Sequence, residues 1–253
     1  MMLPPFTPLQ WTMAVVAAFC IGLSKSGFPG VSMIAVVVMA GLMPARQSSG
    51  VILPLLICGD LLAVRAFRKH VRWPYVWRTL PATAAGVALG YLLMRLPFSE
   101  NFFRILIGGI ILGLVLLQIA RGCKASLDSG VLPAGGPAAL IMGMTAGVTT
   151  MVANAAGPVM SIYLIAMRLP QYDFVGTMAV FFLLVNLIKV PFSVALGLIG
   201  PHSLTLNLVL VPAVALGILA GRTILARIPR RAFEWVILAL AGIAAVKLIV
   251  DGM

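Results

Sequence analysis

Long apolar segments recur from one end of the chain to the other, and they limit the fold more than any other feature of the sequence. Each is about the length that a helix needs to cross a hydrocarbon core of about 30 Å. Only 9% of the 253 residues are charged, against roughly 25% in a soluble domain, and no alternating membrane-barrel pattern occurs. We therefore predict an all-α, polytopic membrane protein with about eight to ten helical segments. With the short segments counted, they run over about 9–23, 28–43, 48–64, 79–94, 102–120, 137–153, 159–167, 172–198, 204–225 and 233–250.

The stretch Gly22–Gly30, with the sequence GLSKSGFPG, interrupts the first apolar region. Glycine and proline disfavour a helix interior by about 1 and about 3 kcal/mol relative to alanine. Within a bilayer, broken backbone is tolerated only where it is buried in protein or lines a cavity, and Lys25 stands in the middle of this break. A second interruption, Thr149–Pro158, lies in the other half of the chain. We interpret the two breaks as the two halves of one binding site.

The two halves of the sequence align with each other. A shift of 126 residues places Asp60 on Asn186. A shift of 131 residues places Pro81, Ala82, Ala84, Gly86 and Gly90 on Pro212, Ala213, Ala215, Gly217 and Gly221. We predict two transmembrane repeats, residues 1–122 and 137–253, joined by a cytoplasmic linker at 123–136. The four glycines of the aligned series are interpreted as sites of close helix packing.

The net charge of +12 indicates orientation in the membrane rather than nucleic-acid binding, because the basic residues fall mostly at the ends of segments. The positive-inside rule then predicts that the loops at 65–78, 121–124 and 222–231 are cytoplasmic and that both termini are not. By the alignment, the basic loop after the third segment corresponds to the nearly uncharged turn at 197–207. That turn is predicted to lie on the non-cytoplasmic side. The repeats are therefore predicted to be inverted, and the protein to lie in a bacterial inner membrane. At the breaks, re-entrant hairpins and segments that cross the membrane fully are both compatible with this orientation.

Inverted repeats with interrupted segments at corresponding places are typical of the substrate site of a secondary transporter. Helices that restart after the breaks direct free N–H groups and partial positive charge into the protein centre, which suits an anion. Each of two central residues also has an alternative to a binding role. Lys25 could snorkel to an interface, and Asn154 could only cap a helix or bond to a neighbour. The candidate substrate-binding residues are Ser24, Lys25, Ser26, Gly27, Gly30, Thr149, Thr150, Asn154, Gly157 and Pro158.

Asp60 and Lys189 are the other ionisable residues deep in apolar sequence, where a charge costs at least about 2.5 kcal/mol on insertion scales. Lys189 follows Asn186, the counterpart of Asp60, by one helical turn, so an Asp60–Lys189 pair across the repeats is one arrangement to expect. A static ion pair and a role in coupling are both open. If Asp60 carries the coupling proton, Asp60→Asn should lose coupling to the proton gradient and retain substrate binding.

The same residues resemble a known family. Four stretches are similar to motifs of the sulfite exporter TauE/SafE family: GLSKSGFPG at 22–30, LPLL at 53–56 before Asp60, GVTTMVANAAGP at 147–158 and FFLLVNLIK at 181–189. The resemblance covers nearly the whole chain. It implies a duplicated transporter of sulfite, organosulfonates or related small anions, mostly outward. Glycine or histidine is common in the family where this chain has Ser26, Pro29, Asn154 and Ala156, a difference that bears on the anion selected.

A secondary transporter that exports small sulfur-containing or carboxylate anions by alternating access is our leading hypothesis, with no cofactor and no metal. A membrane-embedded enzyme is the second class, but only His70 and His202 are present and no HExxH or GxSxG motif occurs, so we predict no enzyme. A passive anion channel would share the cavity features. The expected partners are the anion and the lipid bilayer, with no nucleic acid; proton or sodium coupling and the oligomeric state stay open.

Overall fold

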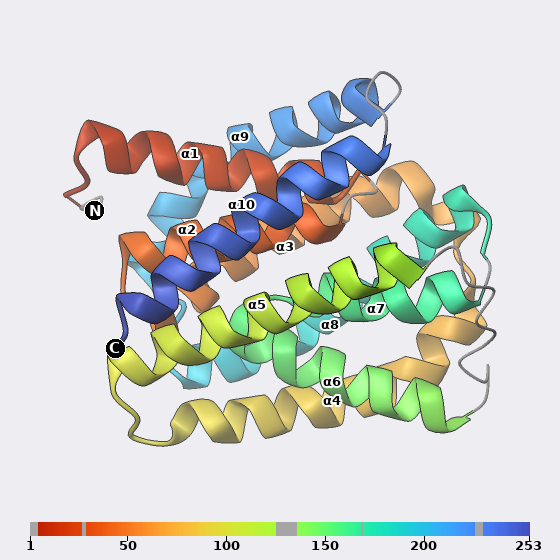
Figure 1. The fold of residues 1–253 in the computed structure, drawn as a ribbon, viewed down its shortest axis with the longest axis horizontal. Helices are drawn as coiled ribbons and strands as arrows, with labels where there is room; N and C mark the ends of the chain where they lie inside the picture. Colours follow the sequence, from red (N-terminus) through yellow and green to blue (C-terminus); the bar gives the residue numbers. More distant parts are fainter. Residues whose placement is uncertain (1–4, 27–28, 125–135, 168, 226–229) are drawn as a thin grey trace.

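The computed structural model describes residues 5–26, 29–124, 136–167, 169–225 and 230–253. These residues form α helices and two short 3₁₀ turns, and the described part of the chain contains no strand (Figure 1). The elements are α1 (Pro8–Ser24), η1 (Pro29–Val31), α2 (Ser32–Leu42), α3 (Ala45–Phe67), η2 (Arg68–His70), α4 (Trp73–Arg95), α5 (Glu100–Lys124), α6 (Gly136–Ala153), α7 (Ala156–Ala166), α8 (Gln171–Ala195), α9 (Pro201–Leu225) and α10 (Arg230–Val250).

Several of the described helices are long and apolar enough to cross a membrane, and they carry large apolar side chains on their outer faces. Leu208 on α9 is 75% exposed and Ile141 on α6 is 60% exposed, as expected for surfaces in contact with lipid. The five apolar spans are Ala45–His70, Glu100–Ala120, Gly136–Ala153, Tyr172–Ala195 and Ser203–Gly221. The predicted all-α, polytopic membrane fold is confirmed.

The basic region predicted as a loop at 65–78 is mostly helical. Helix α3 continues to Phe67, the turn η2 follows, and α4 begins at Trp73. Hydropathy ends a segment where arginines begin, but arginine is a good helix former and a cation is favourable in the last turn of a helix. The two helices are therefore longer than their apolar parts.

Helices α1 and α2, and helices α6 and α7, form two hairpins at the predicted breaks. Helices α2 and α7 each have 11 residues, or about 16 Å at 1.5 Å per residue, about half of a hydrocarbon core. Figure 1 shows the first hairpin starting from the end of the molecule where both termini lie, and the second from the opposite end. This arrangement is compatible with the inverted repeat, which stays a prediction. Most of the predicted linker, residues 125–135, lies outside the described residues.

A close crossing of α1 and α9 holds the first hairpin. A Cβ atom added to Gly22 would lie 2.0 Å from the carbonyl oxygen of Val214, and one added to Gly217 would lie 2.1 Å from that of Phe19. The two backbones are therefore in direct contact, and a side chain at either glycine would push the helices apart.

The second hairpin is held in the same way, by a crossing of α6 and α4. A Cβ atom added to Gly147 would lie 2.2 Å from the carbonyl oxygen of Thr83, and one added to Gly86 would lie 2.3 Å from that of Met144. The packing interpretation is confirmed for all four glycines of the aligned series, since a Cβ atom on any of them would lie less than 3 Å from a neighbour. Each hairpin is thus packed against a helix from the other half of the chain.

Candidate functional site

A cavity lies where the two hairpins meet helices α3 and α8, and its walls contain both breaks. Its volume is about 50 Å³, several times the roughly 10–15 Å³ that one water molecule needs, so a small anion has room. The lining residues are Ser24, Lys25, Ser32, Leu56, Asp60, Ala63, Thr150, Asn154, Gly157, Phe174, Val175, Met178, Ala179, Phe182 and Asn186.

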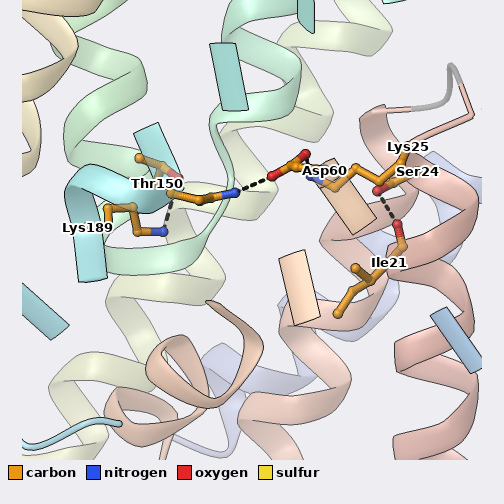
Figure 2. Close-up of polar contacts among 7 residues, drawn as sticks. Ile21, Ser24, Lys25, Asp60, Thr150 and Lys189 are labelled. Atoms are coloured by element: carbon orange, nitrogen blue, oxygen red, sulfur yellow. Dashed lines mark hydrogen bonds and ion pairs between the residues drawn. The ribbon is translucent and has the colours of Figure 1, made fainter. Parts of the chain in front are cut away.

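Lys25 ends helix α1 and forms a buried ion pair with Asp60 of α3. The distance from Lys25 Nζ to Asp60 Oδ1 is 2.6 Å, and the two side chains are 10% and 0% exposed. The second carboxylate oxygen accepts a hydrogen bond of 2.7 Å from Asn186 Nδ2 on α8. The ring of Phe182 lies beneath the ammonium group, with its centroid 5.2 Å from Nζ. Lys25 therefore points into the protein (Figure 2), and the snorkelling alternative is wrong.

Lys189 of α8 reaches the other break and does not pair with Asp60. Its Nζ donates to Asn154 Oδ1 at 2.5 Å and to Thr150 Oγ1 at 3.3 Å, both neutral acceptors. Its side chain is 1% exposed, and no carboxylate in the described part of the chain lies within ion-pair distance. The expected Asp60–Lys189 pair is absent: the partners of the two carboxylate oxygens are Lys25 and Asn186, and Lys189 is directed to the second break. Figure 2 shows the two lysines on opposite sides of that carboxylate.

Asn154 ends helix α6 and joins the second break to α3. Its φ angle is 49°, in the left-handed region that asparagine tolerates better than most residues and that commonly ends helices. Its Nδ2 donates to the carbonyl oxygen of Ser49 at 2.9 Å and to Ser49 Oγ at 3.2 Å. Asn154 therefore ends a helix, bonds to a neighbouring helix and accepts from Lys189.

The starts of both short helices belong to the cavity wall. Ser32 is the first residue of α2 and Gly157 is the second residue of α7. The first turn of a helix leaves N–H groups without intrahelical partners and carries partial positive charge. The second restart falls at Ala156 rather than at Pro158, because proline is tolerated within the first turn of a helix.

Five of the predicted substrate-binding residues, Ser24, Lys25, Thr150, Asn154 and Gly157, line the cavity. Four others do not. Ser26 Oγ donates to a carbonyl oxygen of α9 at 3.1 Å, and Thr149 Oγ1 donates within its own helix at 2.7 Å. Gly30 lies in η1 and Pro158 in the first turn of α7, outside the wall, and Gly27 lies outside the described residues.

The apolar part of the wall was missed by the sequence prediction. It comes mainly from α8, through Phe174, Val175, Met178, Ala179 and Phe182, with Leu56 and Ala63 of α3. One signal could have found part of it. Phe182 precedes Asn186 by four residues, and such residues share one face of a helix. Ser49 and Ser32 were also missed, although Ser32 lies only two residues after the first break.

A polar cluster at the start of α8 ties that helix to the connection between α3 and α4. Arg72 Nε donates to Asp173 Oδ2 at 2.6 Å, and His70 Nδ1 lies 3.4 Å from the other oxygen. The backbone N–H of Arg72 donates to Thr177 Oγ1 at 3.0 Å. Because Phe174, Val175 and Met178 line the cavity, this cluster fixes the part of α8 that carries them.

Comparison with known proteins gives one result that spans the whole site. A family model described as "Sulfite exporter TauE/SafE" matches residues 14–248, a range that includes both breaks and every residue of the cavity wall. No curated protein and no solved structure matches the chain.

Proposed function

Because the chain belongs to the sulfite exporter TauE/SafE family, a family of membrane transporters, we propose that it exports small anions. The proposed substrates are sulfite, organosulfonates or related sulfur-containing or carboxylate anions. The anion is held in the cavity between the two breaks, near the middle of the bilayer. No catalysis is proposed.

The distribution of charge around the cavity is the observation that carries this proposal. Lys25 lines the cavity on one side of Asp60, and Lys189 lies on the other side, in contact with the wall residues Thr150 and Asn154. A buried charge without a partner is costly. Among the described residues, the ammonium group of Lys189 contacts the neutral acceptors Thr150 and Asn154 of the cavity wall, so an anion in the cavity would supply an opposite charge close to it.

We propose alternating access as the mechanism, with the two breaks as the fixed substrate site and the two repeats as the moving parts. The equivalent crossings of α1 with α9 and of α6 with α4 support a two-fold relation between the halves. In the proposed orientation the basic regions face the cytoplasm of a bacterial inner membrane and both termini face away from it. The cluster of Asp173 with Arg72 then closes the cytoplasmic side of the cavity.

Counterflow in proteoliposomes tests this function. Vesicles loaded with unlabelled sulfite should take up radiolabelled sulfite faster than empty vesicles, because a carrier exchanges its substrate across the membrane. Lys189→Gln should abolish the uptake. Lys247→Gln, at an exposed lysine paired with Asp251 on α10, should leave it unchanged.

Two results would count against the proposal. Uptake that is equal in loaded and empty vesicles would indicate a passive channel instead of a carrier. Uptake that Lys189→Gln leaves unchanged would remove the cavity from the transport path.

A further inference from the structure

The charges around the cavity can be counted, because the described groups near it are few and their partners are known. In their ionised forms, Lys25 in the wall and Lys189, which contacts the wall residue Thr150, contribute two positive charges, and Asp60 contributes one negative charge. Beyond the cavity, Asp173 of α8 and Arg72 form their own ion pair at 2.6 Å, and the basic residues Arg65, Arg68 and Lys69 are exposed and do not line the cavity. With these three groups ionised, the empty cavity and its described surroundings have a net charge of one positive unit.

The helix ends add little to this count. Helices α2 and α7 begin at the breaks and bring partial positive charge, while α1 and α6 end at the same breaks and bring partial negative charge of similar size. The four ends give the cavity directional hydrogen-bond donors and acceptors. They do not change its net charge.

We infer, on the basis of the proposed function, that this cavity selects singly charged anions over doubly charged ones, and that Asp60 determines this charge preference. A monovalent anion neutralises the site. A divalent anion of the same size leaves an uncompensated negative charge in a buried place, which is costly. Substrates of the site are then hydrogen-bearing oxyanions, sulfonates or carboxylates with one negative charge.

The geometry of the site makes Asp60 the residue that determines which anion charge is preferred. Its carboxylate is 0% exposed and is held on both oxygens, by Lys25 and by Asn186, so it cannot turn away from the cavity. The Asp60 carboxylate is paired with Lys25, so Lys189 is the lysine without a carboxylate partner. Removing the charge of Asp60 frees Lys25 as well, so that neither lysine has a carboxylate partner.

The test compares two probes of similar tetrahedral shape, methanesulfonate with one negative charge and sulfate with two. Binding to the purified full-length protein is measured by titration calorimetry. The parent protein should bind methanesulfonate at least about tenfold more tightly than sulfate, the effect of about one unit charge near a partly buried site. Asp60→Asn raises the net charge to two and should reverse this preference.

The double variant Lys25→Gln with Asp60→Asn restores a net charge of one. It should return to a preference for methanesulfonate, even where its affinity is weaker than that of the parent. Lys247→Gln, far from the cavity on the exposed end of α10, should keep the parent's preference. A size or shape effect would not follow the charge in this way.

The outcomes separate this inference from the proposed function. A parent protein that binds sulfate as tightly as methanesulfonate refutes the charge preference, whether or not Asp60→Asn folds. The proposed export of sulfite, measured by counterflow, is not affected by that result. A preference unchanged by Asp60→Asn removes Asp60 as the deciding residue. If the parent binds neither probe and shows no sulfite counterflow, the proposed function fails and this inference fails with it.

Discussion

The buried ion pair between Lys25 and Asp60 should be coupled far more strongly than an exposed pair of the same length. At 2.6 Å, two unit charges attract by about 6 kcal/mol at an effective dielectric constant of about 20. Desolvation offsets much of this attraction, but removing one partner of a buried pair costs about 3–5 kcal/mol. We expect Lys25→Met to lower the free energy of unfolding by about 3–5 kcal/mol, because Asp60 then keeps only its bond from Asn186.

The assay is thermal unfolding of the purified protein in detergent, for the two single variants and the double variant Lys25→Met with Asp60→Asn. A loss of 3–5 kcal/mol corresponds to a fall in Tm of roughly 6–20 °C for a chain of about this size. The double variant should lose about 2 kcal/mol less than the sum of the single variants, because each single variant leaves a buried group unpaired.

The chain provides a matched control for this cycle. Lys247 and Asp251 are also 2.6 Å apart, but their side chains are 75% and 38% exposed. Exposed pairs are typically worth only about 0–1 kcal/mol, so the same cycle on Lys247 and Asp251 should show little coupling. If the two cycles gave equal coupling energies, burial would not be what strengthens the inner pair, and the reasoning would be refuted.

Three further predictions concern packing, the second break and the polar cluster. Gly147→Ala should lower stability by about 1–3 kcal/mol by forcing α6 and α4 apart, whereas Gly109→Ala, where an added Cβ has no neighbour within 4 Å, should cost nothing measurable by thermal unfolding. Asn154→Ala should abolish anion binding in calorimetry, because it releases Lys189 and puts an alanine in the left-handed region, and unchanged affinity would contradict this. Asp173→Asn should change Tm little, since its partner Arg72 is 57% exposed and such pairs are worth about 0–1 kcal/mol, so a large loss would show that the cluster is a structural core.

Much of the fold could be predicted because membrane helices leave a strong signal in the sequence. Apolar length located the segments, and glycine and proline located the breaks at Lys25 and Asn154. These signals are local. They do not depend on how the helices are arranged in space.

The partners within the site could not be predicted in the same way. The alignment put Lys189 one turn from Asn186 and so near Asp60, but which acceptor a lysine reaches depends on the rotation of its helix and on side-chain torsions. Lys189 faces the second break, and Lys25 takes the carboxylate. An apolar wall residue such as Val175 or Met178 has no local signal that separates it from a residue facing lipid, whereas Phe182 has its spacing of four residues from Asn186.

The crossed packing of the hairpins has a consequence for the order of events during synthesis. The hairpin of the first half rests on α9, and the hairpin of the second half rests on α4, through glycines that admit no side chain between the backbones. These close glycine contacts are made between the halves and not within either of them. The packing of α1, with Lys25 at its end, is therefore complete only when α9 has been made and inserted. Assembly of the proposed anion site is then a late step that requires nearly the entire chain.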